Sequence, residues 1–258
     1  MKKLPLSVCI VSGAEAHRLG RALESVAAWA GEIVVLLDAR ADDGTDAVAA
    51  QFGAQVFREP WKGFIGQKNS VAEKCRERWL LNLDADEVVS PELAAEIARV
   101  VGAEPAGAAA FEFPRCTYYC GRWIRHGDWY PDRVLRLWQR GRARWVGEEP
   151  HARLEVDGTV GRLDADLLHF SNESIARQIA KIAPYQLDFV QRRAAAGRSV
   201  GGFELVVRPA WRFLRAYCLR RGFLDGWQGF YIAALAAFST LTRYAMVREA
   251  RTAAKASP

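Results

Sequence analysis

The chain has 258 residues, half of them apolar, with a formal net charge of +6 and five cysteines. This length and apolar content allow one large α/β domain or two small ones around a sizeable core, which excludes a disordered chain. An odd number of cysteines, of which Cys9 and Cys75 lack paired spacing, argues against a disulfide framework and favours a reduced, cytoplasmic protein with no exported segment.

Apolar runs alternate with helical patterns through the first hundred residues. The runs predicted to be strands are Leu6–Val11, Ile33–Leu37, Gln55–Arg58 and the stretch Leu80–Glu87. One helical stretch separates each strand from the next, and the last before Leu80 is expected to run from the segment Lys62–Asn69 to about Arg78. Ser90 followed by Pro91 predicts the start of another helix. This order is typical of an α/β fold with a parallel, doubly wound sheet.

The stretch Leu80–Glu87 closes an apolar run with three carboxylates. Ligands bind at the carboxyl ends of strands in an open α/β sheet, so these acids are expected at a binding edge. Asp84 and Asp86 alternate with Ala85, so in extended geometry they face one side and repel each other unless a cation lies between them. Mg²⁺ or Mn²⁺ fits such oxygen ligands. The alternative is that the two aspartates only begin a loop and Glu87 caps the next helix.

Acids also follow the first two strand runs, at Glu15 and Asp38, and no glycine-rich dinucleotide motif follows the first strand. Carboxylates accept hydrogen bonds from ribose hydroxyls and a base N–H, while Lys68 with a divalent ion can hold a diphosphate. These residue types predict a nucleotide diphosphate site.

Short motifs follow one another along nearly the whole chain. They are Leu6–Ser12, Asp38, Asp43–Asp46, Trp61–Phe64, Gln67–Asn69, Leu83–Glu87, Gly121–His126, Trp129–Asp132, Leu168–Phe170 and Gly222–Gly226. Their order resembles the family 2 inverting glycosyltransferases with the GT-A fold. It is most similar to the branch that adds sugars to the lipopolysaccharide core, such as its β-1,4-glucosyltransferases.

The resemblance implies a role for each nucleotide-site residue. Asp38 would bind the uridine of a UDP-sugar, Asp84 would contact the nucleotide, and Asp86 would bind the metal. Nucleotide-sugar contacts are also expected from Ser12, Glu15, Lys68 and Asn69. Two motifs depart from the family pattern: Ser12–Glu15 replaces Thr-x-Asn-Glu, and Pro150–Ala152 replaces Val-His-Glu, so any role of that last glutamate is lost or moves to Glu148 or Glu149.

The second half is dense in aromatics and arginine between Phe111 and Trp145. Aromatic rings stack on sugar faces and arginines bind phosphates in bidentate fashion, which favours an acceptor that carries phosphorylated sugars. The alternative is a core with a basic rim. The residues predicted to bind the acceptor are Arg122, Trp123, Arg125, Trp129 and Arg136.

An inverting transfer needs one base to deprotonate the acceptor hydroxyl. The resemblance implies Asp132, which is followed by Val134-Leu135-Arg136 and looks like the position of the family's catalytic Asp ahead of a Leu-x-Arg segment. His151 is the second candidate. A late histidine contributes to the metal shell or touches the diphosphate in some GT-A enzymes, which suggests His169. Either histidine could instead have a structural role.

The C-terminal part carries the positive charge. From residue 191 onward, eleven arginines and one lysine stand against three acids, which gives +9 and leaves −3 for the first 190 residues. The uncharged run Gly226–Thr242 has 17 residues, at or below the roughly 20 that span a bilayer. An arginine-flanked helix lying on an anionic membrane surface is therefore predicted, with packing against the domain as the alternative.

The resulting expectation is a metal-dependent transferase with three parts: residues 1–100 bind the nucleotide sugar, 101–190 bind the acceptor and complete the same domain, and 191–258 form a basic helical tail. It would move a hexose, with glucose favoured, from a UDP-sugar to a core oligosaccharide or similar glycolipid at the inner face of the cytoplasmic membrane, without nucleic acid. The alternatives are a non-catalytic sugar-nucleotide-binding adaptor at the membrane and a sugar-nucleotide pyrophosphorylase. A phosphatase is less consistent with the motif, which follows the fourth strand.

Overall fold

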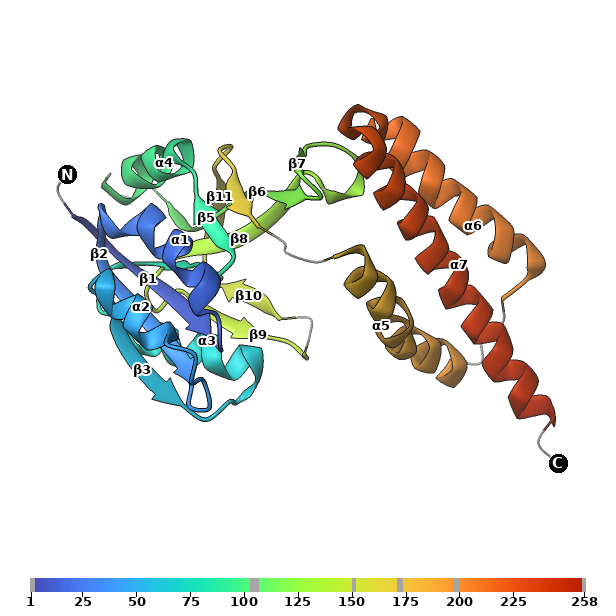
Figure 1. The fold of residues 1–258 in the computed structure, drawn as a ribbon, viewed down its shortest axis with the longest axis horizontal. Coiled ribbons are helices and arrows are strands. Elements are labelled where there is room, and N and C mark those ends of the chain that lie inside the picture. The colour runs from blue at the N-terminus through green and yellow to red at the C-terminus, as the bar shows by residue number, and fades with distance from the viewer. Residues whose placement is uncertain (1–2, 103–106, 150–151, 171–173, 197–199, 257–258) are drawn as a thin grey trace. The chain divides into compact units, whose positions relative to one another are not determined.

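The computed structural model describes residues 3–102, 107–149, 152–170, 174–196 and 200–256. Two compact units make up the chain (Figure 1): residues 1–116 with 132–170, and residues 117–131 with 171–258. The first unit is an α/β fold, and helices dominate the second. The boundary expected near residue 190 falls inside a helix, α5 (Ile175–Ala195), that belongs with the C-terminal helices.

Four parallel strands form the N-terminal half of the sheet. They are β1 (Leu4–Ser12), β2 (Ala30–Asp38), β3 (Gln55–Glu59) and β4 (Trp79–Asn82), in the order β3-β2-β1-β4. All three pairings are parallel, as the alternation of strand and helix patterns predicts. The carboxyl ends of β1, β2 and β4 therefore meet at one edge.

The later strands extend the sheet beyond β4 in the order β8-β6-β12-β5, and β8 is antiparallel to both its neighbours. Their bounds are β5 (Glu87–Val89), β6 (Ala108–Tyr119), β8 (Asp132–Gln139) and β12 (Leu167–His169). The strand β11 (Thr159–Arg162) runs parallel to β6, and β9 (Ala143–Val146) pairs with β10 (Arg153–Val156) in a separate antiparallel hairpin.

Helices cover both faces of the sheet. On one face, α1 (Ala16–Ala27), α2 (Thr45–Gln51) and α4 (Pro91–Gly102) pack over alternate residues of β1, including Leu6, Val8 and Ile10. On the other face, α3 (Gly63–Lys74) and the β9–β10 hairpin cover Cys9 and its neighbours. The side chain of Ser90 accepts a hydrogen bond from the N–H of Leu93 at 3.1 Å, which confirms the predicted start of α4.

The helix α3 begins and ends earlier than the sequence pattern predicts. Its first residue, Gly63, has φ of +81°, so any residue with a side chain would be strained there, and a Cβ would also displace the carboxylate of Glu149, 2.5 Å away. The helix stops at Lys74 because the next amides are captured by the sheet. The N–H of Arg76 donates to buried Glu32 at 2.8 Å, and the N–H of Glu77 donates to Ser7 at 3.1 Å.

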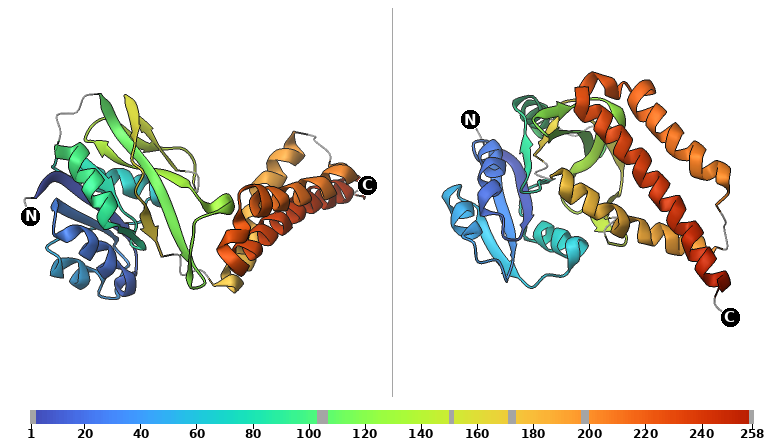
Figure 2. Two further views of the ribbon diagram at one scale, coloured as in Figure 1. Left: turned by 90° about the horizontal axis from the view of Figure 1, so that it is seen from above. Right: turned by 45° about the vertical axis from the view of Figure 1, so that its right-hand side comes forward.

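The second unit contains α5, α6 (Gly202–Leu214) and α7 (Gly226–Ala256), and α7 packs along both other helices (Figure 2). A π-helical turn, η2 (Arg215–Leu219), and a 3-10 turn, η3 (Gly222–Asp225), connect α6 to α7. The remainder is β7 (Arg122–Ile124), paired with the end of β6, and the 3-10 turn η1 (Gly127–Trp129). Buried Asp225 accepts hydrogen bonds from the N–H groups of Arg125 and His126, which ties the segment 117–131 to the turn η3 just before α7.

Candidate active site

The acidic stretch after β4 lies at the carboxyl edge of the parallel strands, as predicted. Asp84 lies two residues after Asn82, the last residue of the strand, and its two oxygens are bound by Lys68 at 3.3 Å and by Arg136 at 2.5 Å. Burial by itself would raise the pKa of Asp84, but the positive charges of Arg136 and Lys68 hold it well below its ordinary value. Asp84 is therefore a carboxylate fixed in place by two cations.

A fully buried carboxylate, Glu87, holds the turn that contains Asp84. Glu87 accepts hydrogen bonds from Arg136 at 3.1 Å and from Arg115 at 3.2 Å, and its second oxygen accepts from the N–H of Asp84 at 3.0 Å. Glu87 thus holds the Asp84 turn, whereas capping of the next helix is performed by Ser90. The two arginines make burial of this charge possible.

Arg136 was expected to bind the acceptor, but its guanidinium is buried inside this cluster. It contacts Asn82 at 3.1 Å in addition to Asp84 and Glu87, and only 5% of the residue is exposed. An arginine in the middle of the apolar pattern of β8 needs buried carboxylate partners, so its position in the sequence could have indicated this role. Arg136 holds the acidic turn through its contacts with Asp84 and Glu87.

Replacing Arg136 by methionine should therefore destabilise the protein strongly. The change keeps a long side chain but leaves Asp84 and Glu87 short of a cation, and breaking a buried ion pair costs about 3 kcal/mol or more. Urea denaturation should show that loss in the free energy of unfolding. Arg40→Met is the matched control, since Arg40 pairs with Asp38 but is 79% exposed, and surface pairs contribute only about 0–1 kcal/mol. Equal unfolding midpoints for the two variants would contradict this reading.

The second aspartate of the motif faces a histidine from a distant strand. β12 pairs antiparallel with β5, with His169 opposite Glu87, and this register places the His169 Nε2 atom 3.6 Å from an oxygen of Asp86. Arg18 approaches the same oxygen at 3.4 Å. Burial opposes ionisation of Asp86, yet His169 and Arg18 lower its pKa below the ordinary value.

This pair fits a divalent ion that completes its shell with substrate oxygens. A histidine nitrogen and a carboxylate oxygen 3.6 Å apart can both reach one cation. Among the described residues, no group of three or more histidine, cysteine, aspartate or glutamate side chains forms a metal cage. Mg²⁺ in particular is usually held by one or two carboxylates together with phosphates and water, which agrees with an incomplete protein shell.

The loop after β1 is held together by its own polar groups. Ser12 donates to Glu15 at 3.0 Å, Glu15 forms an ion pair with Arg18, and the N–H of Glu15 donates to Thr45 at 3.0 Å. Arg18 was not anticipated from the sequence, although its spacing of three residues from Glu15 on a helix could have indicated the pair. Through Arg18 this loop is linked to Asp86.

The remaining nucleotide-site residues have different surroundings. Asp38 ends β2 at the same edge and is bound by Arg40 at 2.7 Å. Lys68 lies on α3, over the Trp145 ring at 4.6 Å, and burial and the nearby Arg136 lower its pKa although Asp84 counteracts them. The side-chain amide of Asn69 donates to the carbonyl of Trp145 and accepts from its N–H, each at 2.9 Å, so Asn69 fixes β9 against α3.

The candidate base Asp132 is the first residue of β8 and lies opposite Arg115 of β6. Both hydrogen bonds from Arg115, at 3.0 and 2.6 Å, reach the same oxygen, Oδ2. The side chain is 43% exposed. Arg115 was not anticipated, although a charged residue within an apolar strand pattern again indicates a buried partner. Because Arg115 also binds Glu87, it connects the candidate base to the acidic turn.

The other predicted site residues come from the second unit and from the segment before β10. Arg122, Trp123, Arg125 and Trp129 belong to the second unit, where Arg122 donates to Leu224 O at 2.9 Å and Trp129 packs on the ring of Tyr119. His151 lies outside the described residues. Glu149, one possible substitute for the family's missing glutamate, accepts a hydrogen bond from the N–H of Ile65 at 3.1 Å and so caps the start of α3.

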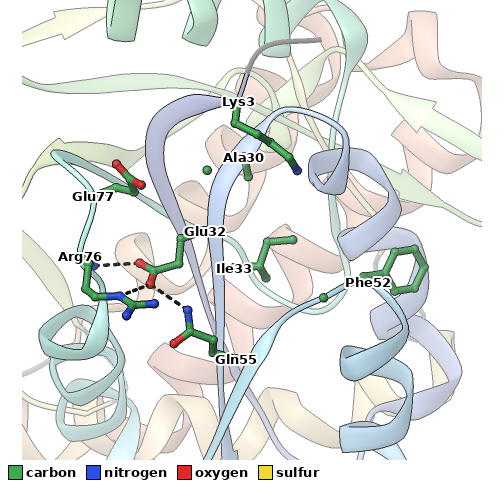
Figure 3. Close-up of a pocket in the computed structure, with 10 residues that line it drawn as sticks. Lys3, Ala30, Glu32, Ile33, Phe52, Gln55, Arg76 and Glu77 are labelled. Carbon is green, nitrogen blue, oxygen red and sulfur yellow. Dashed lines mark hydrogen bonds and ion pairs between the residues drawn. The ribbon is translucent and has the colours of Figure 1, made fainter.

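A cavity of about 260 Å³ lies at the opposite edge of the sheet, where β2 and β3 begin (Figure 3). Glu32 is its central acid and is bound by Ser7, Gln55 and Arg76. The pKa of Glu32 is lowered because these hydrogen bonds outweigh burial. Ligands of open α/β sheets bind at the carboxyl ends of strands, so this network is assigned a structural role.

Solved structures of similar fold identify the class to which this architecture belongs. The mannosyltransferase PcManGT of Pyrobaculum calidifontis, solved with GDP-Man and Mn²⁺, aligns over 99% of this chain and 82% of its own with a TM-score of 0.51 at 15% identity. Residues 1–349 of S. aureus TarS, solved with UDP-GlcNAc, align over 96% and 92% with a TM-score of 0.50 at 14% identity. The fold is that of a GT-A glycosyltransferase.

Sequence comparison identifies the family. The model described as glycosyl transferase family 2 matches residues 7–156. An uncharacterized glycosyltransferase of Rickettsia felis is 30% identical over 260 residues, which is 95% of this chain and 89% of that protein. The lipopolysaccharide core biosynthesis glycosyltransferase LpsC of Rhizobium meliloti is 30% identical over 265 residues, covering 95% and 94%. The chain belongs to glycosyl transferase family 2 and is an enzyme of that class.

Proposed function

We propose that the protein transfers a hexose, with glucose favoured, from a UDP-sugar to a lipopolysaccharide core oligosaccharide or a similar glycolipid, with inversion at the anomeric carbon. The observation that carries this proposal is the Asp86–His169 pair beside the Asp84 and Lys68 cluster at the carboxyl edge of the sheet. One sequence relative and one structural neighbour support it: LpsC is named a lipopolysaccharide core biosynthesis glycosyltransferase, and TarS was solved with a UDP-sugar.

The donor would lie along the edge formed by β1, β2 and β4. Asp38, at the end of β2, would accept a hydrogen bond from the uracil, and Ser12 and Glu15 lie at the end of the neighbouring strand. Asp86 and His169 would hold Mg²⁺ or Mn²⁺, and the solved PcManGT complex contains Mn²⁺ with its nucleotide sugar. When bound, such an ion neutralises the diphosphate and stabilises the leaving group. Lys68 supplies a further positive charge from α3.

Asp132 would act as the base. With both Arg115 hydrogen bonds on Oδ2, the oxygen Oδ1 has no hydrogen-bond partner among the described residues and can accept a proton. The acceptor oxygen loses its proton to Oδ1 as it bonds to the anomeric carbon, and the bond from that carbon to the diphosphate breaks on the opposite face, releasing UDP. Arg115 keeps the carboxylate oriented throughout.

A panel of sugar nucleotides tested with core oligosaccharide or glycolipid acceptors examines this function directly. We expect acceptor-dependent release of UDP, with UDP-glucose the preferred donor, that disappears when divalent ions are chelated. A non-catalytic adaptor would release no UDP from any donor. A pyrophosphorylase would instead form UTP when pyrophosphate replaces the acceptor.

We also propose that the second unit holds the enzyme on the inner face of the cytoplasmic membrane. Large apolar side chains on α6 and α7 are exposed, among them Phe203, Val206, Trp227 and Phe238. Within the described residues, Gly222–Thr252 is the one segment long and apolar enough to cross a bilayer by length and composition alone, a test that core helices of soluble proteins also pass. Exposed apolar groups flanked by arginines favour binding at the interface.

A further inference from the structure

A basic cavity of about 580 Å³ lies between α6 and α7 in the second unit. Four arginines line it, Arg208, Arg212, Arg215 and Arg243, together with the rings of Trp211 and Tyr244. The volume lies within the range of about 300–1,000 Å³ typical of small-molecule sites. We name it the α6–α7 arginine pocket.

One buried carboxylate is shared by three arginines, two of which, Arg212 and Arg215, line this pocket. Asp128, 5% exposed, is bound by Arg212 at 3.1 Å, by Arg215 at 2.9 Å and by Arg220 at 3.2 Å. One negative charge cannot neutralise three guanidinium groups. Burial, together with the neighbouring arginines, lowers the pKa of Arg212 even though Asp128 opposes the shift.

The other two arginines add to the excess. Arg208 shares Glu204 with Arg193, at 3.0 and 3.2 Å respectively. Arg243 donates to the neutral amide of Gln186 at 2.7 Å and forms no ion pair with the described acids. Positive charge therefore exceeds negative charge around the pocket, and an anion would relieve the repulsion.

A phosphomonoester suits this arrangement better than a phosphodiester. A monoester carries a charge of about −1.5 to −2 at neutral pH and three strong acceptor oxygens. A diester has one charge and two unesterified oxygens. Guanidinium groups bind phosphate oxygens in bidentate fashion, so several arginines can be satisfied by one monoester.

The surroundings of the pocket indicate that this phosphate is attached to a lipid. Trp211 lines the pocket and is 53% exposed, so one end of the indole can reach apolar surroundings while the pocket stays polar. Further exposed apolar side chains occur on both helices that bound the pocket, at Val207, Leu214, Phe238 and Leu241. A water-soluble phosphate would make no use of them.

We propose that the α6–α7 arginine pocket binds the phosphomonoester headgroup of a membrane lipid. The inference rests on the membrane association proposed above and adds to it a specific headgroup site. The headgroup site can be tested independently of sugar transfer, because UDP release measured without vesicles depends on the catalytic cluster alone.

Vesicle binding can test the site with the full-length protein. The probes are phosphatidylcholine vesicles containing phosphatidic acid, a monoester, or phosphatidylglycerol, a diester, at matched surface charge. Wild-type protein should prefer phosphatidic acid. Arg243→Gln should weaken binding to it by about tenfold, the equivalent of one lost charge-assisted contact. Arg248→Gln is the control, since Arg248 is an exposed arginine of the same helix and does not line the pocket.

The outcomes separate the possibilities. The headgroup site would be overturned if the wild-type protein bound both vesicle types equally well. It would also be overturned if the two variants lost the same affinity for phosphatidic acid vesicles, since either result leaves only diffuse attraction to the membrane. No binding to either vesicle would overturn the membrane association and the pocket together. If glycerol phosphate displaces the protein from phosphatidic acid vesicles as effectively as added phosphatidic acid does, the pocket binds a soluble phosphate instead. Arg208→Gln should reproduce the effect of Arg243→Gln.

Discussion

Asp86→Ala should abolish sugar transfer at every Mn²⁺ concentration. In the proposed metal site this side chain is the carboxylate ligand, and its removal would leave His169, which by itself cannot hold a hard cation against water. Loss of a residue that merely supports a metal ligand already costs about 10–100-fold, so loss of the ligand itself should cost at least about 100-fold in metal-dependent UDP affinity. Calorimetric titration of UDP with and without Mn²⁺ measures this directly.

Two further variants make the result specific. Asp46→Ala removes a carboxylate that is 45% exposed and pairs with Arg58 in the same unit, so it should bind UDP as the wild type does. His169→Ala should retain activity but require more Mn²⁺, because Asp86 remains. Undiminished metal-dependent UDP binding by Asp86→Ala would mean that the ion is held elsewhere.

Asp132→Asn should lower turnover by about 10² to 10⁴ while donor affinity stays close to the wild-type value, since general base catalysis contributes in that range. The asparagine oxygen can still accept the hydrogen bonds of Arg115, so the geometry at Oδ2 is preserved and only basicity is lost. Single-turnover rates and UDP-sugar affinities, measured together, separate chemistry from binding.

The comparison with His151→Ala decides between the two candidate bases. Asp164→Asn serves as the control because Asp164 is an 87% exposed carboxylate that also pairs with an arginine, Arg133. Normal turnover by Asp132→Asn together with an inactive His151→Ala would identify the histidine as the base and would place the acceptor away from Asp132.

The local pattern of the sequence determined the first half of the fold. Apolar runs separated by helical stretches predict β1 to β4 as parallel strands, and an acid directly after a buried strand can only lie at the strand's carboxyl end. The pattern therefore places Asp38 and Asp84 at one edge of the sheet, and the parallel pairings of β1 with β2 and β4 confirm that placement. Ser90 and Pro91 likewise predict the start of α4, because the capping requirement is local.

Tertiary structure alone decided how the charges are compensated. Arg18, Arg115 and Arg136 come from three different elements, and only the order β4-β8-β6 brings the last two to Glu87. His169 reaches Asp86 through the register of β12 on β5. These partners could not be predicted because a buried carboxylate requires cations nearby, while the sequence around it does not indicate which strand supplies them. Strand order and register select those partners, and they arise from the packing of segments far apart in the chain.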